Sequence, residues 1–304
     1  MIRVIILALI LGYSSTFPQE DSSKVALQNP SPMVDYTRKH ERIFETKFQG
    51  ISFSIDSLTS KPIEIYIPKK SQKRSKFDLV IHFHGNPNIV KYAADKYNGS
   101  IIAAILNLGS GSKRYYNQFE DSTLFKRIID SVIAKTKYKI GVKPTLKKVI
   151  LTGFSAGYGA IKKLLETHSE DIDAVLLLDG LHASYIPDRK VLSEGGKIDS
   201  SAFDAFLRFA LEASKEKSAK KFLITHSEIF PGTFVSTTEA TDYILSKLKM
   251  RRKPILKWGP LGMQQLSYAR KNHFMIMGFA GNSAPDHMDH LHAIYHFLNK
   301  LLNL

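Results

Sequence analysis

Apolar and polar positions along the chain form two kinds of segment. Some short segments alternate apolar and polar residues or are almost wholly apolar, as half-exposed and fully covered β-strands are. Between them lie longer stretches with apolar residues at helical spacing. The expected strands are 44–55, 63–67, 77–83, 101–108, 148–152, 174–178, 222–225 and 274–279. The expected helices are 121–137, 156–167, 201–216, 237–250 and 285–302.

Local signals at the helix starts support this division. Ser236 and Glu239 form the pattern of a capping box, and Pro285 follows Ser283 at a first-turn position. Strands that alternate with helices predict an α/β fold with a mostly parallel central sheet, helices on both faces and antiparallel leading strands. In such sheets function gathers at the carboxyl ends of the strands, which is where candidate residues are sought.

The first residues have the pattern of a signal peptide. Arg3 precedes an apolar run over residues 4–11, and small residues follow it. Residues 1–16 are therefore expected to direct export, which predicts a secreted or periplasmic protein. Residues 17–40 are polar and contain three prolines, so we expect a linker or loosely ordered arm there. Residues 41–304, which hold nearly all of the expected strands and helices, are expected to form one folded domain.

Composition narrows the chemistry. The chain has 304 residues, 43% of them hydrophobic, and it contains no cysteine, which excludes disulfides, thiolate metal sites and a cysteine nucleophile. The formal net charge of +15 is spread over small clusters beside expected strands and turns, as on solvated loops. No nucleic-acid-binding motif accompanies the charge. Its sign favours an anionic envelope surface or an anionic substrate.

The strongest local motif surrounds Ser155. Gly153-Phe-Ser155-Ala-Gly157 matches G-x-S-x-G and lies between a buried strand and a helix. A sharp turn at this place projects the serine hydroxyl from the sheet edge, and small neighbours let the turn close. The following helix directs backbone amides and its positive dipole end toward charge that forms beside Ser155. The motif predicts that Ser155 is a nucleophile.

From about Phe44 to the C-terminus the chain resembles the α/β-hydrolase superfamily. A second motif, Phe83-His84-Gly85-Asn86, follows an expected strand directly. In that family the corresponding loop contributes a backbone N–H to the oxyanion hole. The resemblance therefore implies that the N–H groups of Asn86 and Ala156 bind the oxyanion.

The resemblance also implies a late histidine as the base. His287 and His290 share one face of the last expected helix, and His287 is favoured because it lies closer to the strand end. Two carboxylates compete as the acid. Asp179 follows the strand 174–178 directly, whereas Glu228 follows the next strand, where the family more commonly places its acid. Asp179 is favoured for its abrupt strand end beside a glycine.

The expected function is that of a serine hydrolase that cleaves a carboxylic ester through an acyl-enzyme and needs no cofactor. The substrate is a small molecule or an acylated polymer, and residues 182–200 are a candidate cap over the site. The same machinery also fits a peptidase or amidase. Two further alternatives are an inactive, hydrolase-like binding protein of the envelope and a metal site at the cluster 286–292 with His82 and His84.

Overall fold

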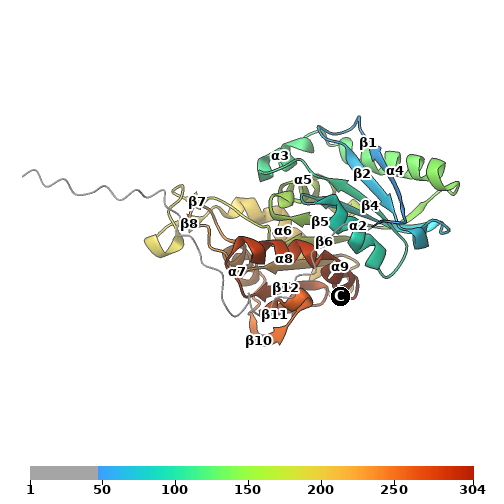
Figure 1. Ribbon diagram of the computed structural model, residues 1–304. Coiled ribbons are helices and arrows are strands. Elements are labelled where there is room, and N and C mark those ends of the chain that lie inside the picture. The colour runs from blue at the N-terminus through green and yellow to red at the C-terminus, as the bar shows by residue number, and fades with distance from the viewer. Residues whose placement is uncertain (1–46) are drawn as a thin grey trace, which may run out of the picture.

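A computed structural model describes residues 47–304 of the chain (Figure 1). The expected signal peptide over 1–16, the linker over 17–40 and the first residues of the expected strand 44–55 lie outside the described residues. In the described part, no helix combines the length and the apolar character needed to span a bilayer.

One large sheet crosses the molecule, and in the described residues it has ten strands in the order β1-β2-β4-β3-β5-β6-β9-β12-β11-β10. Its strands are β1 (Ile51–Ile55), β2 (Ile63–Ile67), β3 (Lys76–Phe83), β4 (Ile101–Leu106), β5 (Thr145–Phe154), β6 (Ala174–Leu178), β9 (Lys221–His226), β10 (Lys253–Trp258), β11 (Gln264–Lys271) and β12 (Phe274–Phe279). The middle of the sheet, from β4 to β12, is parallel. Antiparallel pairs extend it at both edges, which lie far apart in Figure 1.

Helices cover both faces of this sheet. They are α2 (Pro87–Lys96), α3 (Ser112–Gln118), α4 (Leu124–Ile140), α5 (Tyr158–His168), α6 (Asp204–Ala213), α7 (Thr237–Lys247), α8 (Ala284–His292) and α9 (Ile294–Leu302). Residues of α3 to α7 share one apolar cluster with one side of the sheet, and residues of α2, α8 and α9 share the cluster on the other side. The predicted fold class is confirmed.

Several boundaries agree closely with the apolar pattern, and others do not. The strands β6 and β12 have the predicted bounds, and the capping box at Ser236 is present. The single helix expected over 285–302 is wrong, because the chain leaves helical geometry at Ala293 and divides into α8 and α9. The edge strand β10 was not predicted, because its side chains are mostly exposed and show no apolar pattern.

The segment expected as a cap contains a small hairpin. β7 (Tyr185–Ile186) pairs with β8 (Lys197–Ile198) in a separate two-stranded sheet. In Figure 1 this hairpin lies at the left of the molecule, away from β1. His182, at the start of the segment, and Asp199, at its end, line a cavity that Ser155 also lines.

Candidate active site

Ser155 lies in a strained turn between β5 and α5. Its φ angle is +46°, a left-handed conformation that is costly for a residue with a side chain. A single 3-10 turn over Ser155–Gly157 joins the strand to the helix. A Cβ atom at Gly157 would lie 2.1 Å from the carbonyl oxygen of Phe83, so no larger residue fits without moving β3. The sharp turn predicted from the motif is present.

His287 and Asp179 meet at the carboxyl edge of the sheet. His287 lies in the first turn of α8, which Ser283 caps, and its Nδ1 is 2.7 Å from Asp179 Oδ2. Asp179 directly follows β6 and is buried. The backbone N–H of Ser227 donates to Asp179 Oδ1 at 2.9 Å, and the Ser227 hydroxyl donates to Oδ2 at 2.7 Å. Since a carboxylate only accepts, Nδ1 of His287 carries a proton and Nε2 is free to accept one.

These hydrogen bonds determine the charge of Asp179. Burial alone opposes its ionisation, but the neighbouring His290, the hydrogen bond from His287 and the Ser227 N–H together lower the pKa of Asp179 well below its usual range. Burial lowers the pKa of His290 to about 4, so this neighbour is neutral at pH 7. At neutral pH the donors on the carboxylate are therefore the main reason that Asp179 stays ionised.

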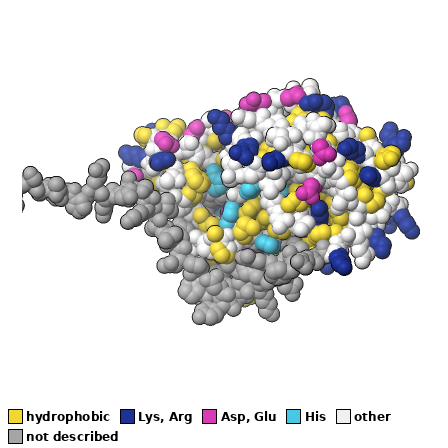
Figure 2. All heavy atoms as spheres, turned by 45° about the horizontal axis from the view of Figure 1, so that its top comes forward, with side chains coloured by type: hydrophobic (Ala, Val, Ile, Leu, Met, Phe, Trp, Pro, Cys, Tyr) yellow, Lys and Arg dark blue, Asp and Glu magenta, His cyan; other side chains and the backbone are white. Residues whose placement is uncertain are grey.

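Two adjoining cavities open beside Ser155. The smaller, of about 330 Å³, is lined by Ser155, Asp179 and His287 together with His182 and Phe234. The larger, of about 670 Å³, shares Ser155, His182 and Phe234 but not His287. Figure 2 shows several histidine side chains reaching the surface close together, beside hydrophobic ones. The candidate nucleophile, base and acid therefore line one cavity.

The alternative base and acid do not line the two cavities. His290 is buried, and its Nδ1 is 2.8 Å from the hydroxyl oxygen of Thr225. Glu228 is exposed, and neither residue lines the two cavities. The contact between His287 and Asp179 includes neither of them.

The two candidate oxyanion donors are placed differently. Ala156 lines the larger cavity beside Ser155. Asn86 is exposed at the N-cap of α2, where its side chain accepts a hydrogen bond from the backbone N–H of Asn88, and it lines neither cavity. The loop before it is strained, since His84 has a φ angle of +72°.

Among proteins of known structure, several resemble this one in the path of the chain. They include an S-formylglutathione hydrolase from Agrobacterium tumefaciens (12% identity, TM-score 0.48, 85% of this chain and 97% of the other). Another is a carboxyl esterase from Tuber melanosporum (14% identity, TM-score 0.45, 87% of this chain and 91% of the other). A third is a feruloyl esterase module from Clostridium thermocellum (12% identity, TM-score 0.46, 90% of this chain and 93% of the other). No protein-family model and no curated protein matches the sequence. Similarities this low say nothing about substrate.

The structural features of the chain itself identify its architecture. A parallel sheet carries a strand–turn–helix elbow at Ser155, and the candidate residues follow in the chain order serine, acid, histidine. The chain has the α/β-hydrolase fold. The resemblance noted in the sequence is thereby confirmed for the fold.

Three residues at the site of this α/β-hydrolase fold were not singled out from the sequence. Ser227 follows the end of β9 and donates to Asp179 twice. His182 lies in the loop after β6, bonds the carbonyl oxygen of Val235 through Nδ1 at 3.0 Å, and lines both cavities. Tyr115 bonds Nδ1 of His84 through its hydroxyl at 2.9 Å. The rule that function gathers at carboxyl strand ends points to the first two, whereas Tyr115 comes from α3 and gives no such signal.

The histidine-rich segments form no metal cluster within residues 47–304. His82 bonds Thr152 and the carbonyl oxygen of His84, and His290 bonds Thr225. His287 is bonded to Asp179. These histidines thus have separate protein partners in the structure.

Proposed function

We propose that this protein is a serine hydrolase that cleaves a carboxylic ester, with Ser155 as nucleophile, His287 as base and Asp179 as the acid that orients it. The observation that carries the proposal is the 2.7 Å contact between His287 Nδ1 and Asp179 Oδ2 beside a cavity that Ser155 also lines. The strained backbone of Ser155 adds support, because strained residues of this kind are found mainly at functional sites, where the surrounding structure holds them in place.

The chemistry follows from the protonation states. Ser155 Oγ attacks the ester carbonyl while Nε2 of His287 accepts its proton, and the N–H groups of Ala156 and Asn86 stabilise the oxyanion. The protonated histidine then donates to the departing alcohol oxygen. Water, deprotonated by the same nitrogen, cleaves the acyl-enzyme and restores Ser155. Asp179, ionised at neutral pH, stabilises the imidazolium at each stage.

A fluorophosphonate probe tests the proposal directly. Purified protein and its Ser155→Ala variant are treated with the probe, and the label is located by mass spectrometry. Label on Ser155, absent from the variant, is the expected result. A folded protein that is not labelled would overturn the proposal and favour the hydrolase-like binding protein. Comparing an ester with the amide of the same acyl group then separates an esterase from an amidase or peptidase.

We also propose that residues 1–16 direct export and are removed, and that residues 41–304 act as the catalytic domain in a secreted or periplasmic protein. The support is the charged start and the apolar run of the first residues. Expression of the full chain in a bacterial host, followed by N-terminal sequencing of the exported protein, tests this. An uncleaved product that remains in the cytoplasm would contradict it.

A further inference from the structure

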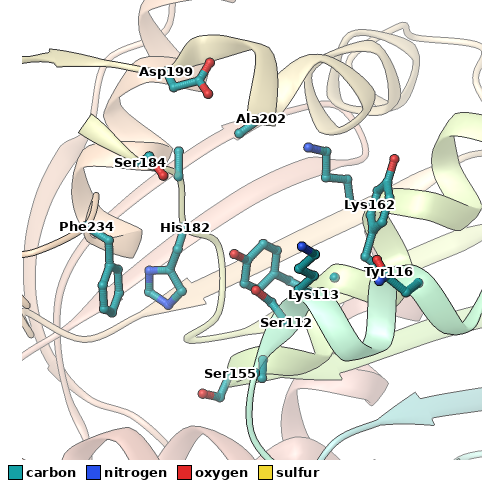
Figure 3. A pocket seen from close by; sticks show the side chains of 16 residues that line it. Ser112, Lys113, Tyr116, Ser155, Lys162, His182, Ser184, Asp199, Ala202 and Phe234 are labelled. Carbon is teal, nitrogen blue, oxygen red and sulfur yellow. The ribbon is translucent and has the colours of Figure 1, made fainter. Parts of the chain in front are cut away.

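The larger cavity beside Ser155 has walls of opposite chemical character (Figure 3). Lys113 of α3 and Lys162 of α5 lie on one side of it. The opposite side carries His182 and Phe234, whose rings pack edge to face with centroids 4.9 Å apart. The cavity thus combines an apolar, aromatic side with a cationic side, and Ser155 lies at its margin.

A close helix contact brings the two lysines to one wall. A Cβ atom at Gly159 would lie 2.1 Å from the carbonyl oxygen of Ser112, so the absence of a side chain lets the start of α3 rest on α5. Lys113 follows Ser112, and Lys162 lies one turn after Gly159. The glycine therefore determines the spacing of the cationic side.

Neither of these lysines has an ion-pair partner among the residues that the structure describes. Lys162 Nζ lies over the Tyr116 ring, 5.6 Å from its centroid, and the Tyr116 hydroxyl donates to Glu166 at 2.8 Å. Glu166 pairs instead with the neighbouring Lys163 at 4.0 Å. Within residues 47–304, no carboxylate lies within ion-pair distance of Lys113 or Lys162. The cavity therefore holds two ammonium groups that can bind an anion from solution.

The carboxylate that lines the same cavity is already bonded. Asp199 Oδ1 accepts from the Ser201 hydroxyl at 2.7 Å and from its backbone N–H at 3.3 Å. In Figure 3 Asp199 lies at the side of the cavity far from Ser155. A bound anion is repelled by Asp199 and attracted by the lysines, which confines it to the α3–α5 side.

The position of His287 decides which part of an ester enters this cavity. In the proposed reaction the leaving oxygen must approach His287, which lines only the smaller cavity. The acyl group then extends into the larger one. Lys162 follows Ser155 by seven residues along the same helical segment, which separates their backbones by about 10 Å.

We infer that the larger cavity is an acyl site for chains that end in an anionic group, which Lys113 and Lys162 bind. The preferred substrates are then esters of acids with a second, distal carboxylate or similar anion. This inference rests on the proposed function for the direction of the acyl chain, whereas the anion site itself does not depend on catalysis.

The test compares two nitrophenyl esters of suberic acid, one with a free distal carboxylate and one with that carboxylate methylated. We expect the ratio of their kcat/KM values to favour the free acid. The double variant Lys113→Gln/Lys162→Gln should lower this ratio at least tenfold, as expected for loss of hydrogen bonds to a charged group. Lys137→Gln, on the exposed side of α4, removes one charge away from the cavity and keeps the ratio. An unchanged ratio in the double variant would overturn the inference.

Binding to the Ser155→Ala variant separates this inference from the proposed function. Calorimetric titration with free suberate should give saturable binding that the two lysine substitutions abolish. Suberate binding to the variant, together with a wild-type protein that the fluorophosphonate probe does not label, would overturn the hydrolase proposal and keep the anion site. Labelling and ester cleavage with no suberate binding would overturn the anion site and keep the hydrolase.

Discussion

The backbone of Gly180 lies directly against that of Ser155. A Cβ atom at Gly180 would be 2.3 Å from the Ser155 carbonyl oxygen and 2.7 Å from its backbone nitrogen. Gly180 follows Asp179, so the residue next to the candidate acid packs on the turn of the candidate nucleophile. The ends of β5 and β6 can therefore meet this closely only because residue 180 has no side chain.

Replacing Gly180 with alanine tests this contact. The added methyl group would overlap backbone atoms of Ser155, so the turn at Ser155 must move. We expect the free energy of unfolding to fall by about 1–3 kcal/mol. The displaced hydroxyl should also lower the rate of fluorophosphonate labelling at least tenfold. Urea denaturation and labelling kinetics measure the two effects. Gly141→Ala is the control: Gly141 has a positive φ angle but no atom within 4 Å of its Cβ position, so stability alone should fall.

Asp179→Asn tests the proposed orienting acid. An asparagine can turn its NH₂ group toward Nδ1 of His287 and favour the tautomer that cannot accept a proton from Ser155. We expect kcat to fall by about 10⁴, as for the equivalent change in a serine protease triad. The matched variant Glu228→Gln, at the exposed carboxylate, should keep kcat within about twofold, the size expected of a surface change. The reverse ranking of the two variants would assign the acid to Glu228.

Much of this arrangement is visible in the sequence. The strands β6 and β12 are wholly apolar and buried on both faces, so their bounds were predicted correctly. The elbow at Ser155 requires residues without side chains close to it in the sequence, so a short motif is enough to predict it. Asp179 was favoured because it ends an apolar strand, a local signal that needs no knowledge of the distant His287.

Other features depend on contacts that no local pattern records. The strand β10 has mostly exposed side chains on a sheet edge. Lys113 and Lys162 line the same cavity wall because α3 packs on α5. The sequence does not indicate that another helix packs against Gly159. Such features arise from tertiary packing. The apolar pattern predicts which faces of strands and helices are buried, but it does not predict which residues of two elements contact each other.

His82 is predicted to position the loop before Asn86. It lies in β3, fully buried, with Nε2 2.7 Å from the carbonyl oxygen of His84 and Nδ1 2.8 Å from the Thr152 hydroxyl oxygen. Because a carbonyl only accepts, Nε2 carries the proton and Nδ1 accepts from Thr152. This hydrogen bond helps to hold His84 in its left-handed conformation.

His82→Leu should therefore affect catalysis as well as stability. Two buried polar groups lose their partner, which costs about 1–3 kcal/mol each, and kcat should fall tenfold or more through the displaced oxyanion loop. Steady-state kinetics on a neutral ester measure the change. Ile128→Val, on the buried face of α4, should cost about 0.5–1.5 kcal/mol with kcat unchanged. An equal kcat for the two variants would show that His82 is only structural.

Three buried histidines predict how stability depends on pH. Burial lowers the pKa values of His82, His226 and His290 to about 4 in the folded protein. In the unfolded chain a histidine titrates near pH 6.5. Between these values the unfolded chain binds more protons than the folded one, so stability falls as the pH is lowered from about 6.5 to 4. Each histidine should contribute up to about 1.4 kcal/mol per pH unit in that window.

His290→Phe isolates one of these contributions. His290 stacks on Phe297 with centroids 6.3 Å apart, so an aromatic ring without a titrating nitrogen fits there. The free energy of unfolding is measured with urea at several pH values between 4 and 7. Its slope against pH should be shallower for the variant than for the wild type, by about the contribution of one histidine. Leu291→Val, on the same helix, changes packing but removes no titrating group and should keep the wild-type slope. A wild-type slope in His290→Phe would mean that His290 is already protonated in the folded protein at these pH values.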